Sequence, residues 1–172
     1  MGCVSGNNLL QRFRVRIKID RGDLGSAFNP FVSGFFVFNQ ITKISGLSLG
    51  EIGIEEMLEQ GKRVKVTDGI VAYPTLSFQA RMYDRNGLLV PEILRAWWQK
   101  RDEVTASIFV DITTRNWCPI YTLGFYGSTI KSLSFPDQEM GQSQVGYVDA
   151  SFEPVEVDFV DLGIQNLASL RV

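Results

Sequence analysis

Apolar and polar residues alternate with a period of two along much of this chain. In the segment 12–20, Phe13, Val15, Ile17 and Ile19 alternate with basic residues. Side chains of a β-strand point alternately to its two faces, so this pattern predicts a half-buried strand. Further strands are predicted where the alternation returns, or where β-branched and aromatic residues concentrate between turn residues. These segments are 35–45, 73–83, 104–112, 118–127, 129–135 and 146–159.

One segment has a helical period instead. After Asn86-Gly87, Pro91 suits the first turn of a helix, and the apolar residues that follow recur at helical spacing. These residues are Ile93, Leu94, Trp97 and Trp98. Many strands and one helix favour a mainly β fold: an antiparallel sandwich or barrel in a single domain, 1–172, with the helix across an open end or one wall of a sheet.

Glycine and polar residues mark the segments that we expect to lie outside the core. The loop 20–34 is long and rich in glycine, and 50–69 is an acidic and then basic stretch bounded by glycines, which is typical of an extended arm. We expect a short helical turn around 55–59 within this arm. The N-terminus 1–11 is expected to be flexible, and 162–172 lacks a clear period and is expected to form a tail that docks on a neighbour.

The composition excludes several classes of function. With 17 basic and 19 acidic residues the net charge is −2, which gives no overall basic field for gripping a phosphate backbone. Apolar runs are far shorter than the about 20 residues that span a bilayer. The N-terminus lacks the features of a secretory signal, so we expect synthesis to end in the cytoplasm. The chain has no histidine, the side chain used most often as a general base or metal ligand.

No motif in the sequence indicates catalysis. Gly61-Lys62 lacks the other residues of a phosphate-binding loop, and the acidic residues of 149–158 are typical of a solvated strand face. Cys3 and Cys118 have no cysteine close in sequence and no histidine to activate them. We therefore predict a protein that is not an enzyme and has no cofactor or metal site. Oxidation of Cys3 and Cys118 into a disulfide between subunits stays open.

Two stripes of opposite charge suggest assembly surfaces. Basic residues alternate along 12–18, and acidic residues follow along 149–161. Their period of two places both stripes on polar strand faces, so Arg14 and Arg16 are expected near 153–158 of the same subunit or the next. Two separate solvated faces are the alternative. Together with the charged residues of the arm, the stripes form the predicted subunit interface: Arg14, Arg16, Lys18, Glu55, Glu56, Glu59, Lys62, Arg63, Lys65, Glu153, Glu156 and Asp158.

A series of short motifs runs through most of the chain. In order they are Phe13-Arg14-Val15, the segment 38–44 leading into Ser45-Gly46-Leu47, Ile54-Glu55-Glu56 with Gln60-Gly61, Lys65-Val66, Gly69, Tyr73-Pro74-Thr75-Leu76, Leu94-Arg95-Ala96-Trp97 and Ile130-Lys131-Ser132-Leu133. This order resembles the tail tube family of contractile bacteriophages, which is related in fold to the haemolysin-coregulated protein of type VI secretion.

The resemblance implies a structural subunit of the virion tail, assembled in the host cytoplasm. Such subunits form hexameric rings whose sheets merge into an inner barrel, and the rings stack into a tube that conducts DNA during ejection. The implied partners are other copies, the tail sheath, baseplate and tape-measure proteins, with transient passage of DNA and no membrane binding. The arm 50–69 would reach a neighbouring subunit or the next ring. The alternatives are a secretion-system, baseplate or terminator paralogue, or a soluble sugar- or peptide-binding sandwich that uses Tyr121 and Tyr126.

Overall fold

The fold was analysed in a computed structural model of the 172-residue chain. The structure describes residues 12–24, 35–59, 62–82, 90–114, 119–135 and 146–160, and for 53–59, 62–68 and 119 it describes the backbone alone. Most of the predicted loop 20–34, the N-terminus 1–11, the tail 162–172 and both cysteines therefore lie outside the described residues.

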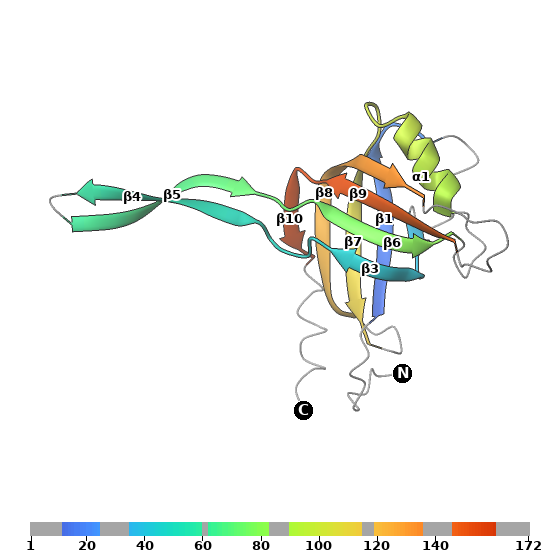
Figure 1. The fold of residues 1–172 in the computed structure, drawn as a ribbon, viewed down its shortest axis with the longest axis horizontal. Helices are drawn as coiled ribbons and strands as arrows, with labels where there is room; N and C mark the ends of the chain where they lie inside the picture. The colour runs from blue at the N-terminus through green and yellow to red at the C-terminus, as the bar shows by residue number, and fades with distance from the viewer. Residues whose placement is uncertain are drawn as a thin grey trace.

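The described strands build an eight-stranded antiparallel sheet that folds over on itself into two layers (Figure 1). The first layer consists, in order, of β2 (Phe36–Phe38), β1 (Arg12–Arg21), β7 (Thr105–Thr113), the first part of β8 (Pro119–Ser134) and β10 (Glu156–Phe159). The second layer consists, in order, of the last part of β8, β9 (Tyr147–Glu153), β6 (Leu76–Arg81) and β3 (Ile41–Ser45). The described strands do not close into a barrel, so the predicted fold class is confirmed in its sandwich form.

β8 belongs to both layers because it bends at Gly127. Its first part pairs with β7 and β10, and the part from Thr129 onward pairs with β9. Gly127 has a φ of 60°, in the left-handed region that glycine adopts without a steric cost, and the Ser128 hydroxyl donates to the Phe125 carbonyl at 3.0 Å. The prediction of two separate strands, 118–127 and 129–135, was therefore wrong.

Two other predicted strands divide where the sequence predicted one. The segment 35–45 forms β2 and β3, which are separated at Asn39-Gln40 and belong to different layers. The segment 146–159 forms β9 and β10, which are separated at Pro154-Val155. Because proline has no backbone N–H to donate, it interrupts the pairing of a strand.

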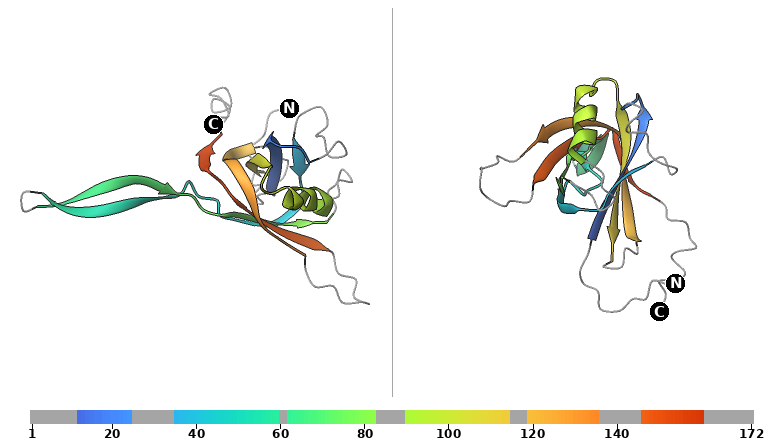
Figure 2. Two further views of the ribbon diagram at one scale, coloured as in Figure 1. Left: turned by 90° about the horizontal axis from the view of Figure 1, so that it is seen from above. Right: turned by 90° about the vertical axis from the view of Figure 1, so that its right-hand side faces the viewer.

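The alternation along the strands places the core between the two layers. Val15 and Ile17 of β1 and the even-numbered apolar residues of β7 are fully buried. The helix α1 (Val90–Gln99) packs against β8 and β9, and its buried face joins the core (Figure 2). Its Trp97 is inaccessible to solvent, lies 4.9 Å from the Phe152 ring and donates its indole N–H to the Val104 carbonyl at 3.3 Å. This bond satisfies the polar atom of a buried tryptophan.

A long hairpin projects from this body (Figure 1). Its strands, β4 (Glu51–Glu59) and β5 (Lys62–Ala72), pair only with each other in a separate two-stranded sheet. The predicted arm 50–69 is thus present, and β5 extends it to Ala72. The expected helical turn around 55–59 is wrong, because this segment pairs along its length with the second strand.

Candidate assembly surfaces

The basic stripe on β1 is anchored by a buried carboxylate on the next strand. Arg14 Nε donates to Asp111 Oδ2 at 2.8 Å, and Arg16 donates through Nε and Nη2 to both oxygens at 2.8 Å each. The Thr122 hydroxyl donates to Asp111 Oδ1 at 2.8 Å from β8 on the other side. The Asp111 side chain is only 1% exposed. Burial raises its pKa, but the hydrogen bonds from Arg16, Thr122 and Arg14 outweigh burial and leave the pKa below its ordinary value.

The intrachain partner of Arg14 and Arg16 is therefore Asp111, not the acidic segment 153–158. Sequence reasoning missed Asp111, although it lies at an outward position in the alternation of 104–112. Only the pairing of β1 with β7, which sets Arg14 opposite Asp111, reveals the contact. Whether the predicted residues form a subunit interface stays a proposal.

Aromatic rings continue the same face beyond the arginines. The Arg16 guanidinium lies 5.4 Å from the ring centroids of both Phe35 and Phe109. Phe109 in turn meets Tyr126 edge to face at 5.8 Å. The Tyr126 ring lies over Gly124, where a Cβ would stand 2.7 Å from the ring. Cation–π contacts and the salt bridges together hold Arg16 in one orientation.

The acidic residues divide between the two layers. One row of paired residues crosses four strands of the first layer: Arg16, Phe109, Gly124 and Asp158. The basic stripe and β10 therefore share the outer face of this layer. Three strand spacings separate the ends of this row, about 14 Å. Glu153 instead lies on β9, where its carboxylate is 3.7 Å from Lys131 Nζ.

The backbone register of the arm sets two pairs of oppositely charged residues opposite each other. Glu56 stands opposite Lys65, and Glu59 stands opposite Lys62. Glu55 and Arg63 stand opposite apolar residues, Val66 and Leu58 respectively. At the base of the arm several large apolar side chains are exposed: Leu49, Ile52, Ile70 and Val71. The base of the arm therefore exposes apolar surface.

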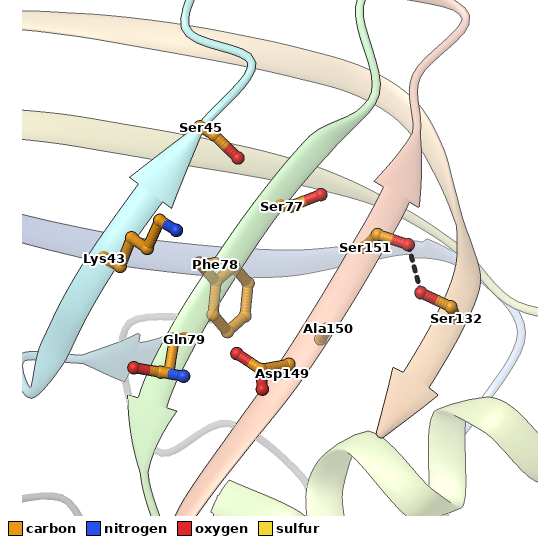
Figure 3. Close-up of a pocket in the computed structure, with 9 residues that line it drawn as sticks. All are labelled: Lys43, Ser45, Ser77, Phe78, Gln79, Ser132, Asp149, Ala150 and Ser151. Carbon is orange, nitrogen blue, oxygen red and sulfur yellow. Dashed lines mark hydrogen bonds between the residues drawn. The ribbon is translucent and has the colours of Figure 1, made fainter. Parts of the chain in front are cut away.

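The outer face of the second layer carries a polar hollow of about 180 Å³ (Figure 3). Lys43, Gln79 and Asp149 stand on three adjacent strands, and the hydroxyls of Ser132 and Ser151 are hydrogen-bonded to each other. Asp149 is the single carboxylate in its lining, so the hollow lacks the carboxylate pair of a glycosidase. Neither Tyr121 nor Tyr126 lines it.

Within the described ranges, the structure contains no group of three or more acidic or cysteine side chains placed to hold a metal ion. In the same part of the chain, no helix has the length and apolar character needed to cross a bilayer.

Comparison with known proteins places the fold. No family model matches the sequence, and no curated protein matches it. A chain of the sheath–tube complex of the PVC extracellular contractile injection system superposes with a TM-score of 0.61 and 14% identity, covering 87% of this chain and 88% of that one. A chain of the anti-feeding prophage baseplate superposes with a TM-score of 0.58 and 14% identity, covering 91% of this chain and 97% of that one. A type six secretion system protein superposes with a TM-score of 0.51 and 17% identity, covering 86% of this chain and 82% of that one. The chain therefore has the fold found in these contractile assemblies.

Proposed function

We propose that this chain is the structural subunit of a tube in a contractile tail, where it forms stacked hexameric rings around a lumen. The observation that carries the proposal is the match of fold over nearly the full length of chains from a sheath–tube complex and a baseplate. One of these assemblies is described as six-fold symmetrised. A structural role, without catalysis, agrees with the surfaces described above.

The projecting arm supports assembly on physical grounds. An isolated two-stranded hairpin is marginally stable in water and requires packing against another element. The β4–β5 hairpin forms no ladder with the rest of the described chain, and Ile52 and Val71 are exposed at its base. We propose that a neighbouring subunit or the next ring covers the arm. The charged positions Glu55, Glu56, Glu59, Lys62, Arg63 and Lys65 would then contribute contacts there.

The open edges of the sandwich support ring closure. In the described residues, β2, β3 and β10 each pair with one strand and leave an outer edge. Exposed edges promote uncontrolled association, and closure into a ring covers them. We propose sheath, baseplate and tape-measure proteins as partners of the tube, in a virion tail assembled in the host cytoplasm. The net charge of −2 suits a lumen through which DNA slides without being gripped.

A baseplate or terminator paralogue is the second candidate function. Similar chains come from a sheath/tube terminator, with a TM-score of 0.58, and from a tube-terminating cap, with 0.57. A subunit that ends a tube would form single rings, whereas a tube subunit would form stacks of variable length.

Shortening the arm tests the proposal. Ile52 and Val71 are paired, so residues 53–70 can be replaced by Asn-Gly, a two-residue hairpin turn. We expect the body to keep its thermal unfolding midpoint, because the arm packs on itself, and to lose stacked tubes in sedimentation and negative-stain microscopy. A variant with Asn-Gly inserted between the paired residues Glu59 and Lys62, which keeps the whole arm, is the matched control. Normal tubes from the shortened variant would refute the role of the arm.

A further inference from the structure

The outer face of the first layer has opposite charges at its two ends. At one end β1 presents Arg12, Arg14, Arg16 and Lys18 at alternate positions. At the other end β10 presents Glu156 and Asp158, both exposed, in the rows of Tyr126 and Gly124. This face therefore has a basic end and an acidic end.

The two ends cannot neutralise each other within one subunit. Asp111 engages Arg14 and Arg16, and Asp20, which accepts from Ser107, is the other acidic residue beside the stripe. Lys18 and Glu156 have no ion-pair partner among the described residues. Between the ends lie the Phe109 and Tyr126 rings and about 14 Å of sheet, well beyond salt-bridge reach.

The acidic end is a firmly held edge strand. The pairing of β10 with β8 is extended on both sides, because the Val155 N–H donates to Tyr126 and the Val160 N–H donates to Thr122, each at 3.0 Å. Val155 and Phe159 add apolar surface there, with exposed fractions of 73% and 54%. This combination of charge and exposed apolar groups suits a protein partner.

We propose that the acidic β10 edge of one copy docks head to tail on the basic β1–β2 side of the next copy. This joint rests on the proposed ring, and it names the surfaces that close the ring. Glu153 is excluded from the joint, since it lies on the second layer beside Lys131. A joint between different surfaces of one chain is the kind that repeats around a closed ring.

Strand direction and the arm are compatible with this joint. Four antiparallel pairings separate β2 from β10, so the two edge strands run in the same direction and would meet in parallel across the joint. The arm leaves the body on the side where β10 lies, and β1 and β2 lie on the opposite side (Figures 1 and 2). A neighbour docked on β10 would therefore also stand beside the arm.

Charge reversal tests the joint in the full chain. The first variant, Glu156→Lys with Asp158→Lys, makes both ends basic. The second, Arg12→Glu with Lys18→Glu, makes the outer stripe acidic and leaves Arg14, Arg16 and Asp111 in place. Each variant alone would oppose like charges at every joint, whereas neighbours in an equimolar mixture would face opposite charges. A ring of six can alternate the two variants, and native mass spectrometry would count three of each.

The matched control is Asp149→Lys with Glu153→Lys on β9, which changes the net charge by the same amount as the first variant. We expect each reversed variant alone to need at least about tenfold more protein for ring formation, the mixture to assemble near wild-type concentration, and the control to behave like wild type. Recovery in the mixture also shows that both variants fold. Rings from either variant alone at wild-type concentration, failure of the mixture, or equal loss in the control would overturn the joint. Wild-type chains that form no rings at any concentration would overturn the tube proposal as well.

Discussion

Replacing Asp111 by asparagine removes the carboxylate that holds the basic stripe against β7. Three hydrogen bonds from Arg14 and Arg16 and one from Thr122 converge on this side chain, which is 1% exposed. Breaking a buried ion pair by deleting one partner costs about 3–5 kcal/mol. The two arginines are 32% and 27% exposed and regain some hydration in the variant, so we expect a loss of about 3 kcal/mol.

Urea unfolding at a protein concentration below assembly measures this loss. With an m-value of about 2–3 kcal/mol per molar, the midpoint should fall by roughly 1 M and the m-value should stay the same. Asp158→Asn is the control, because its carboxylate is exposed and its removal should change stability by less than about 0.5 kcal/mol.

The pH dependence gives a second readout of the same cluster. The folded pKa of Asp111 is lowered from its ordinary value of 3.8, so its contribution is present above that value and is lost as pH falls through the lower, folded pKa. The stability difference between wild type and Asp111→Asn should therefore be constant at neutral pH and shrink below about pH 4. An unchanged urea midpoint, or a stability difference that persists undiminished in acid, would show that the Asp111 carboxylate does not stabilise the fold through these contacts.

Three further predictions follow from other parts of the chain. Gly46→Ala should destabilise the fold by at least about 3 kcal/mol in urea unfolding, because the φ of Gly46 is 83° and a Cβ would lie 2.1 Å from the Thr75 carbonyl oxygen. Gly69 has a φ of 73° with open space around it, so Gly69→Ala should cost only about 1 kcal/mol. Trp97→Ala should cost about 3–5 kcal/mol in the same assay, because the whole indole is buried. If Cys3 and Cys118 link subunits, non-reducing electrophoresis of thiol-trapped assemblies should show dimers or ladders, and monomer alone would exclude that link.

The spacing of apolar residues within short segments predicted most of the strands and the helix. The alternation in β1 and β7 and the helical spacing around Trp97 are properties of short segments, and the structure confirms them. The arm was predicted from its glycines and charge runs, but its helical turn was not confirmed, because pairing of 51–59 with 62–72 satisfies the backbone in an extended form. Tertiary pairing commonly overrides local preference in this way.

Non-local pairing explains what the sequence left out. Arg14 and Asp111 are 97 positions apart, and only the register of β1 against β7 brings them together. The bend at Gly127 was interpreted as a break between strands, because a glycine within a strand and a glycine in a turn look alike in sequence. Likewise the acidic segment 149–161 was interpreted as one stripe, although β9 and β10 carry its residues 149–153 and 156–159 to different layers.

Electron microscopy of the purified wild-type protein over a range of concentrations is the most direct test of the proposal that copies of this chain build a tube from hexameric rings. We expect rings with six-fold symmetry that stack end to end, with adjoining copies joined between β10 and the β1–β2 side. Monodisperse monomers at every concentration, or rings of another symmetry, would contradict it.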